Sequence, residues 1–215
     1  NEAWHWSFIP KANIYLKEYN KRINYNDIDG FMGSEFAKDL NKTTDYQKFS
    51  PKSKDYQKLW HPKLKLFMPK DEDGNWLPIN PKLDGGLGYR NYYDENNGWT
   101  YAWAVQHDID GLIDLLDGKK AAENRLDQLF REPIGTQKNL FYVNGSNSTG
   151  MVGQFSMGNE PSFHIPFLYN YFGAPWKTQK RTRFLLDVWF KDNIFGIPGD
   201  EDGGGMTAFV VFTSM

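Results

Sequence analysis

The chain has 215 residues with 25 basic and 27 acidic side chains, and its net charge of -2 excludes any argument from bulk electrostatics. Disulfide bonds and thiolate metal sites are excluded because the chain has no cysteine. The length suits one domain over residues 1–215 with a sizeable core, and no apolar run approaches the length of a membrane span.

In the first part of the chain, residues 1–33 are expected to be irregular or extended, and helices are expected to dominate after them. Apolar periodicity predicts a short helix from residue 34 to 40, and a serine followed by proline predicts a second helix over 50–60. Alternating apolar residues and an acidic turn at 71–74 predict a β-hairpin over 63–80. Because this turn lacks calcium ligands at both ends of an EF-hand loop, we interpret it as a solvated turn.

Capping signals and apolar periodicity predict more helices in the rest of the chain. They are expected up to His107, from Asp108 to Gly118, over 121–131, over 161–172, over 175–193, and from Met206 onward. Long loops separate several of these helices, and charged or polar residues concentrate in alternate loops. This order of elements is typical of an α/α toroid, in which inner helices carry the site loops at one rim.

The loop over residues 199–205 is unusual because three consecutive carboxylates are followed by three glycines. Like charges repel, and ordering glycines costs entropy, so the loop costs stability unless a cation or a reaction compensates. A second acidic junction, Gly158-Asn159-Glu160-Pro161, places a carboxylate where a helix is expected to begin. The two acidic junctions suggest one site.

Three loops hold the candidate chemical groups: Asp94-Glu95, Asn159-Glu160 and Asp200-Glu201-Asp202. Glycoside hydrolysis needs one protonated carboxyl to release the leaving group and one carboxylate to activate water or attack directly. Calcium prefers carboxylate, amide and carbonyl oxygens, all of which the Gly158-Asn159-Glu160 corner offers. Taken singly, each acid is better explained as a helix cap or a solvated turn, but their concentration in three loops favours a joint function.

Two histidines have both a structural and a functional interpretation. His107 is explained as a polar rim residue, and Asp108 after it as a helix N-cap. His164 follows Glu160 by one helical turn, so either both face one cleft or His164 is a satisfied buried histidine. No histidine pair has zinc spacing, and no nucleophile lies at a recognisable spacing from a histidine base.

Aromatic residues make up 17% of the chain, including eight tryptophans and twelve tyrosines. Amphipathic rings on a rigid wall suit the faces of sugars, although aromatic residues also fill ordinary cores. Lysines gather between residues 48 and 70 among aromatic residues, but no phosphate-binding loop or basic recognition motif accompanies them. We interpret this stretch as a solvated helix face and expect no nucleic-acid partner.

Four longer motifs carry a resemblance to a known family. They are Glu-Asn-Asn-Gly-Trp-Thr-Tyr (95–101) with His107-Asp108, Gly-Asn-Glu-Pro-Ser-Phe-His-Ile (158–165), Ala-Pro-Trp-Lys-Thr-Gln (174–179) and Gly-Ile-Pro-Gly-Asp-Glu-Asp-Gly-Gly-Gly-Met (196–206). In this order they resemble glycoside hydrolase family 92, whose members are calcium-dependent, inverting exo-α-mannosidases. The resemblance implies a mainly α fold, part of an (α/α)6 toroid with long rim loops and a small β-hairpin.

The resemblance also implies roles for single residues. Glu95 matches the general acid, and Asp202, with Asp200 beside it, matches the carboxylates that activate water. Gly158, Asn159 and Glu160 match the corner that holds Ca²⁺, which is expected to bind two sugar hydroxyls and to favour a distorted ring. Substrate contacts are expected at Trp99, His107, Asp108, Gln154, Phe155 and His164. Gln154 and Phe155 stand where the family has a His-Glu pair for 1,2-linked substrates, so the preferred linkage stays open.

The expected partner is a mannose-containing glycan, and the expected location is secreted or periplasmic because mannosylated glycans occur outside the cytosol. The family's β-sandwich and its other toroid helices are expected as the remaining parts of a full-length enzyme, and the true amino terminus is expected to lie elsewhere. Two alternatives belong to other classes: a glycan-binding module that keeps the calcium corner without turnover, and a mannosyl-phosphate hydrolase. Intact Glu95 and Asp202 argue against the first, and glutamate in place of glutamine at position 95 argues against the second.

Overall fold

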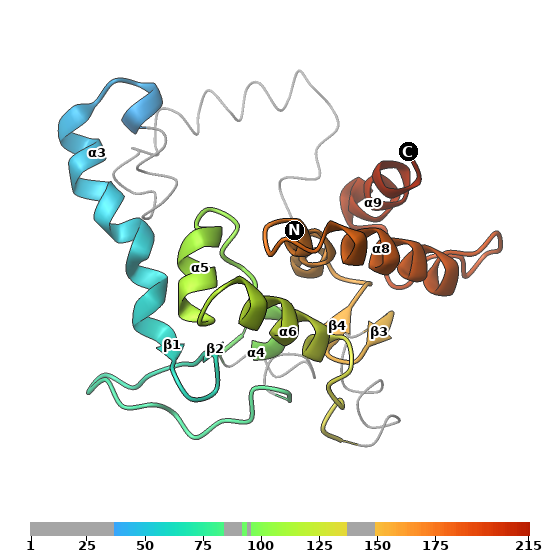
Figure 1. Cartoon of the computed structure of the whole chain (residues 1–215), viewed down its shortest axis with the longest axis horizontal. Coiled ribbons are helices and arrows are strands. Elements are labelled where there is room, and N and C mark those ends of the chain that lie inside the picture. Colours follow the sequence, from blue (N-terminus) through green and yellow to red (C-terminus); the bar gives the residue numbers. More distant parts are fainter. Residues whose placement is uncertain (1–36, 84–91, 94–95, 137–148) are drawn as a thin grey trace. The chain divides into compact units, whose positions relative to one another are not determined.

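The structure, a computed structural model, describes residues 37–83, 92–93, 96–136 and 149–215. These residues are mainly helical and contain two small antiparallel sheets (Figure 1). The mainly α fold with a small β-hairpin that the sequence predicts is therefore confirmed. The segment expected to be extended, residues 1–33, lies outside the described residues.

The chain divides into two compact units, Asn1–Lys58 and Leu59–Met215. In the first unit, α3 (Thr43–Phe49) is followed directly by a 3₁₀ helix, η2 (Ser50–Leu59). The helix predicted over 50–60 is therefore present as a 3₁₀ helix, but the predicted N-cap is wrong, because Ser50 has helical φ and ψ angles of -54° and -41° and continues the chain from α3.

The first β-hairpin of the second unit lies earlier than predicted. β1 (Trp60–His61) pairs with β2 (Leu66–Phe67), and the rings of Trp60 and Phe67 meet edge to face at 5.0 Å. Lys65 has a φ of 54°, and its backbone N–H donates to the carbonyl of His61. The chain therefore reverses before β2.

The acidic turn at 71–74 is present as a solvated turn, as predicted. The Asp71 carboxylate accepts from the backbone N–H of Asn75 at 2.7 Å, and one isolated bridge joins Lys70 to Trp76. Asp71 therefore closes its own turn with its side chain.

Three helices follow in chain order: α4 (Gly98–Tyr101), α5 (Ile109–Leu115) and α6 (Lys119–Leu129). The Asp108 carboxylate accepts from the backbone N–H of Gly111, so the predicted N-cap of α5 is confirmed. The helix predicted up to His107 is shorter than expected, because α4 ends at Tyr101.

The next segment holds a second hairpin and two 3₁₀ helices. β3 (Met151–Val152) pairs with β4 (Phe155–Ser156), and η3 (Glu160–Ser162) and η4 (Ile165–Asn170) follow. The helix predicted over 161–172 is therefore present as two short 3₁₀ helices and not as one continuous helix. Pro166 lies inside the predicted range and has no N–H to donate to the carbonyl four residues before it, so a continuous α-helix is interrupted there.

Two α-helices complete the chain: α8 (Pro175–Trp189) and, after the 3₁₀ turn η5 (Asp202–Gly204), α9 (Gly205–Ser214). α8 packs against η4. The core of this unit contains large side chains with almost no exposed area, among them Trp103, Leu112, Leu126, Leu129, Phe155, Met157, Ile165, Tyr169 and Leu185. The core thus draws on α5, α6, η4 and α8.

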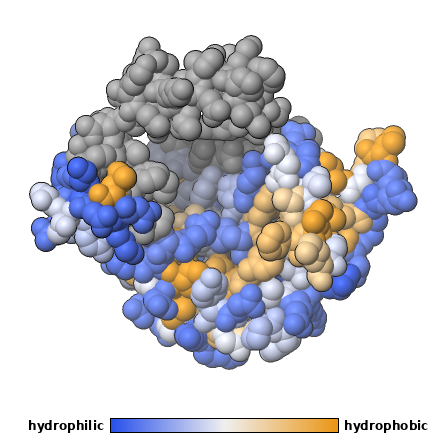
Figure 2. All heavy atoms as spheres, turned by 90° about the horizontal axis from the view of Figure 1, so that it is seen from above, coloured by the Kyte–Doolittle hydropathy of each residue, from blue (hydrophilic) through white to orange (hydrophobic). Residues whose placement is uncertain are grey.

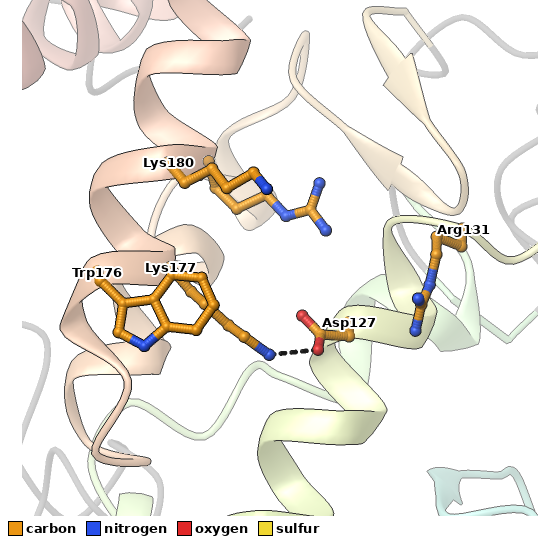
Figure 3. Close-up of a pocket in the computed structure, with 6 residues that line it drawn as sticks. Asp127, Arg131, Trp176, Lys177 and Lys180 are labelled. Atoms are coloured by element: carbon orange, nitrogen blue, oxygen red, sulfur yellow. Dashed lines mark hydrogen bonds and ion pairs between the residues drawn. The ribbon is translucent and has the colours of Figure 1, made fainter.

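A partly buried ionic cluster ties α8 to α6 (Figure 3). Lys177 on α8 forms ion pairs with Glu123, at 2.6 Å, and with Asp127, both on α6. The Tyr169 hydroxyl donates to Asp127 at 2.8 Å. Hydrogen bonds from Lys120 and Lys177 hold the pKa of Glu123 below its ordinary value of 4.5. Burial acts to raise the pKa of Asp127, but hydrogen bonds from Lys177 and Tyr169 outweigh it and hold that pKa below 3.8.

Replacing Lys177 with methionine is expected to lower the free energy of unfolding by about 2 kcal/mol at neutral pH, because two carboxylates lose a charged hydrogen-bond donor. A carboxyl group whose pKa is lowered by folding contributes its full stability at a pH above its ordinary pKa, here 4.5 for Glu123 and 3.8 for Asp127. This contribution is lost as the pH falls toward the lowered pKa. Denaturant unfolding should therefore show a difference between wild type and variant that shrinks in acid. Lys180→Met, in the same pocket, is the matched control and should cost less than about 0.5 kcal/mol.

On the face shown in Figure 2, hydrophilic side chains alternate with hydrophobic areas among the described residues. Ile194, Phe195 and Phe212 are 91%, 84% and 81% exposed. The lysines of α3 and η2 are exposed, as expected for a solvated helix face. Within the ranges that the structure describes, no helix is both long enough and apolar enough to cross a membrane.

Candidate functional site

The backbone that leads into α4 is held by two buried asparagines. Glu95, the predicted general acid, lies outside the described residues. Asn97 caps α4, since its side-chain oxygen accepts from the backbone N–H groups of Trp99 and Thr100 at 3.0 and 3.2 Å. The Asn96 side-chain oxygen accepts from the Thr100 hydroxyl at 3.1 Å. The two residues after Glu95 are therefore fixed to the first turn of α4.

The Gly158-Asn159-Glu160 corner lies beside the acidic loop. A side chain at Gly158 would put its Cβ 2.3 Å from the carbonyl oxygen of Pro198, and one at Gly199 would come within 2.9 Å of the Gly158 carbonyl oxygen. Both positions therefore need glycine, and Gly199 also has a φ of +98°. This close contact between two backbones brings residues 199–205 to the corner, as the sequence suggests.

The helix after the acidic loop is anchored by aromatic side chains. The ring of Phe209 on α9 lies 5.9, 6.3 and 6.1 Å from the rings of Phe163, Phe167 and Phe190. The Cβ position at Gly205, the first residue of α9, lies 3.7 Å from Cγ of Glu160. The start of α9 thus sits directly against the Glu160 side chain.

The three acids of the loop have different surroundings. Asp200 is exposed, and Asp202 is half-buried with a left-handed φ of 54°. The Glu201 carboxylate accepts from the backbone N–H and the hydroxyl of Thr207, each at 3.0 Å, and so caps α9. Glu201 therefore has a structural role, which leaves Asp200 and Asp202 as the candidates for chemistry.

The donor set of the corner fits a hard cation. Asn159 is 2% exposed, and its side-chain Nδ2 has no hydrogen-bond partner in the part of the chain that the structure describes. Turning this amide by 180° places its oxygen at the same point, and calcium accepts amide, carboxylate and backbone oxygens. Among the residues that the structure describes, no group of three His, Cys, Asp or Glu side chains gathers to hold a metal. A cation here would therefore use Asn159, the exposed Glu160 carboxylate and backbone oxygens such as that of Gly158.

His164 joins η4 to the turn after α4. Its Nε2 donates to the Trp103 carbonyl at 2.8 Å, and its Nδ1 accepts from the Gln106 side chain at 3.2 Å. Burial lowers the pKa of His164, while the Trp103 carbonyl acts in the opposite direction. Both ring nitrogens of this half-buried histidine are therefore hydrogen-bonded within the protein, and these contacts favour the interpretation of His164 as a satisfied histidine.

The other predicted sugar contacts fall into exposed and internal positions. His107 is exposed and Asp108 is half-buried as the cap of α5. Phe155 is fully buried against Phe130, with ring centres 4.9 Å apart, and Gln154 is also fully buried. Their described contacts favour an internal role for Gln154 and Phe155 over the substrate contact predicted from the sequence.

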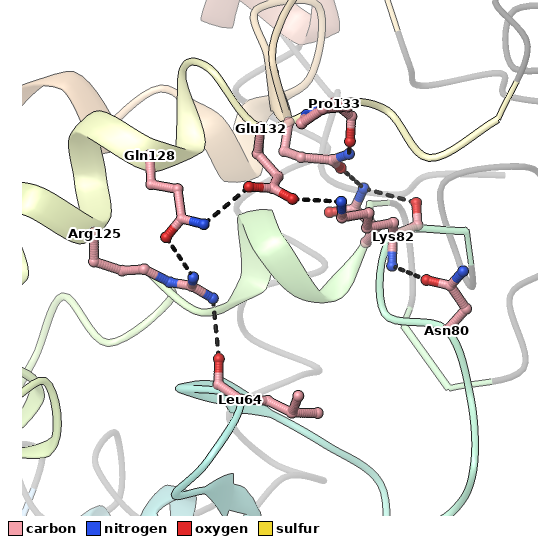
Figure 4. Close-up of polar contacts among 9 residues, drawn as sticks. Leu64, Asn80, Lys82, Arg125, Gln128, Glu132 and Pro133 are labelled. Atoms are coloured by element: carbon pink, nitrogen blue, oxygen red, sulfur yellow. Dashed lines mark hydrogen bonds and ion pairs between the residues drawn. The ribbon is translucent and has the colours of Figure 1, made fainter.

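A polar network around Trp99 was not foreseen from the sequence. The Arg125 guanidinium lies 3.9 Å from the ring centre of Trp99 and donates to the carbonyl of Leu64 at 3.0 Å. Gln128 accepts from Arg125 and donates to Glu132, which pairs with Lys82 (Figure 4). Arg125 and Gln128 are three residues apart, and Gln128 and Glu132 are four apart; these spacings are the local signals of the network.

The glycosyl hydrolase family 92 catalytic domain matches residues 5–215. The chain therefore belongs to this family. An uncharacterized secreted glycosidase of Arthroderma benhamiae is 28% identical over 223 residues, which cover 95% of this chain and 26% of that protein.

Solved structures show the same similarity. A family 92 α-mannosidase from Bacteroides thetaiotaomicron, in complex with mannoimidazole, matches with a TM-score of 0.73 and 30% identity over 85% of this chain and 24% of that one. A family 92 inverting mannosidase from the same bacterium matches with a TM-score of 0.66 and 30% identity, over 85% of this chain and 25% of that one. The chain thus spans about a quarter of the length of these relatives, and its fold is that of a part of the family's mainly α toroid.

Proposed function

We propose that the protein removes terminal α-mannosyl residues from glycans by calcium-dependent hydrolysis with inversion at the anomeric carbon. The observation that carries this proposal is the family match over residues 5–215. One solved relative is described as an α-mannosidase and another as an inverting mannosidase. The contact between the acidic loop and the Gly158 corner supports the proposal, because it brings the loop that carries Asp200 and Asp202 beside the corner that carries Asn159 and Glu160.

In the proposed reaction, Glu95 gives a proton to the glycosidic oxygen as its bond to the anomeric carbon breaks. Asp202, with Asp200 beside it, takes a proton from a water molecule that attacks that carbon from the opposite face. Trp99, His107 and Asp108 contact the sugar. The products are β-mannose and an alcohol, so every proton is accounted for.

Gly158, Asn159 and Glu160 are the residues proposed to hold calcium. When bound, the ion would bind two sugar hydroxyls and favour a flattened ring on the way to an oxocarbenium-like state. The close packing of Gly158 against Pro198 keeps the corner beside Asp200 and Asp202. We also propose that the protein is secreted or periplasmic, since a relative is described as a secreted glycosidase.

Release of mannose from α-mannosides by the purified whole protein tests the proposed function. Mannose should appear in the presence of calcium. A protein that binds mannose but releases none from any α-mannoside at saturating calcium would be a binding module instead.

Chelation is expected to abolish the hydrolysis of α-mannosides, and calcium should restore it. Glu160→Gln should raise the calcium concentration for half-maximal activity by at least about tenfold, since a neutral amide is a weaker ligand than a carboxylate. Calcium titration calorimetry and activity measurements on wild type and variant check both effects. Glu72→Gln, which removes an exposed carboxylate from the solvated turn, is the matched control and should leave calcium dependence unchanged. Equal activity after exhaustive chelation would remove the metal from the mechanism.

A further inference from the structure

A cavity of about 180 Å³ lies between the end of α6 and the first turns of α8 (Figure 3). Basic side chains dominate its lining, which consists of Asp127, Arg131, Trp176, Lys177, Lys180 and Arg181. Four cations therefore share the cavity with one carboxylate. None of the six lining residues belongs to the acidic loop or to the Gly158 corner, so the cavity is a separate feature of the second unit.

The carboxylate of the cavity is already engaged within the protein. One oxygen of Asp127 pairs with Lys177, and the other accepts from the Tyr169 hydroxyl at 2.8 Å. Lys177 also pairs with Glu123 at 2.6 Å. The charge of Lys177 is therefore balanced by two carboxylates, and Asp127 has no oxygen left for a second cation.

The other three cations of the cavity lack this balance. In the described part of the chain, no carboxylate lies within ion-pair distance of Arg131, Lys180 or Arg181. The positive end of the dipole of α8 adds to their charge, because the N-cap residue is Ala174, whose side chain accepts no hydrogen bond. Like charges gathered in one cavity repel each other, and a bound anion would relieve that repulsion.

Trp176 adds an exposed aromatic surface to the cavity. The residue is 58% exposed, and the Lys177 ammonium lies 5.4 Å from the centre of its ring. An indole combines apolar area with a polar edge, which suits the apolar face of a sugar ring. The cavity therefore offers two kinds of contact, one for an anionic group and one for a flat apolar face.

The walls of the cavity are fixed before any ligand binds. The ion pairs of Lys177 join α8 to α6, and the Thr178 hydroxyl of α8 donates to the carbonyl of Pro166 in η4 at 2.8 Å. The Arg181 guanidinium lies 4.5 Å from the ring centre of Phe130, which positions it at the wall. A site that is already ordered loses little affinity to conformational entropy.

We propose that this cavity binds a phosphorylated sugar, with the phosphate held by Arg131, Lys180 and Arg181 and the sugar ring stacked on Trp176. A phosphate monoester carries about 1.5 to 2 negative charges at neutral pH, and the planar fork of arginine matches two of its oxygens. The proposal goes beyond the proposed function, because the cavity contains none of the residues assigned to hydrolysis. It also stands independently of any activity on mannosides.

Titration calorimetry on the whole protein tests the proposal with mannose 6-phosphate, inorganic phosphate and mannose. Calcium is first removed by chelation and dialysis, so that neither the metal nor a sugar bound to it contributes. Mannose 6-phosphate should bind with a Kd below about 1 mM. Inorganic phosphate should bind about three- to tenfold more weakly because it cannot stack on Trp176, and mannose at least about tenfold more weakly because it lacks the charge.

Single substitutions assign the two contacts. Arg131→Met and Lys180→Met should each weaken the binding of mannose 6-phosphate about 5- to 20-fold, because each removes a charged hydrogen-bond donor. Trp176→Ala should weaken mannose 6-phosphate about three- to tenfold and leave inorganic phosphate within about twofold. Arg183→Met is the matched control: it removes one exposed positive charge from α8 outside the lining, so affinity should stay within about twofold of the wild type.

Failure of the wild type to bind mannose 6-phosphate would overturn the proposal. So would a loss in Arg183→Met as large as that in Lys180→Met, because the effect would then come from the overall charge of α8. Equal affinities for mannose 6-phosphate and inorganic phosphate, or an unchanged affinity in Trp176→Ala, would overturn the sugar contact. Thermal unfolding curves of the variants show that they are folded, and the substituted side chains at 131, 176 and 180 are exposed.

Discussion

Changing Asp202 to asparagine is expected to slow the hydrolysis of every α-mannoside by about 10²- to 10⁴-fold, because an amide cannot take a proton from water. The loss should be similar for activated and unactivated substrates, since both need an attacking water. The backbone should tolerate the change: Asp202 has a φ of 54°, and asparagine adopts this left-handed region readily. Steady-state kinetics on both substrate types, with a thermal unfolding curve to show that the variant is folded, check the prediction.

Glu201→Gln is the control for the charge of the acidic loop. Glutamine keeps an oxygen that accepts from Thr207, so the cap of α9 should survive while one negative charge is lost. If Glu201→Gln keeps its activity within about threefold of the wild type, the loss of one negative charge from the loop does not explain the slow hydrolysis expected of Asp202→Asn. The loss of a base then explains it. An Asp202→Asn variant with more than about a tenth of wild-type activity would move the base to another group, and Asp200 would be the next residue to test.

Elements with local start and stop signals were predictable from the sequence. Asp108 caps α5, and Gly118 follows α5 with a φ of +102°, a conformation that glycine adopts without steric cost. The first hairpin was misplaced because the most conspicuous turn signal lies at 71–74, whereas the strands pair around Lys65. A positive φ at a lysine has no signature in the sequence, and the pairing is supported by Trp60 packing on Phe67, which is a cross-strand contact.

The types of residue in the candidate site were predictable from the sequence, but the contacts that bring them together were not. Carboxylates that follow glycines could be read as a group, and the structure does bring residues 199–205 to the Gly158 corner. That contact forms because Gly158 and Gly199 let the two backbones approach closely. These glycines lie about 40 positions apart in the chain, so no local sequence pattern indicates the contact. The same limit applies to Gln154: its type and position suggested a sugar contact, but its partners Asn97 and Pro133 come from two other segments.

Glu95→Gln is expected to produce the most selective loss of activity. Glutamine has the same shape but no acidic proton, so kcat on an α-mannobiose should fall about 10²- to 10⁴-fold. On 2,4-dinitrophenyl α-mannoside the loss should stay below about tenfold, because the leaving group needs no protonation. This pattern differs from that of Asp202→Asn, which should slow both substrates, and so the two variants together assign the acid and the base.

The stereochemistry of the wild-type reaction provides an independent check of these two roles. If Glu95 protonates the leaving oxygen while Asp202 activates water on the other face, the two carboxyl groups must leave room for that water, roughly 6.5–9.5 Å rather than the ~5 Å of retaining enzymes. Proton NMR during the first turnovers should then show β-mannose before mutarotation produces the α anomer. If α-mannose appears first, Asp202 acts as a nucleophile or another group delivers the water, and the assignment of the base is wrong even though the chain belongs to family 92.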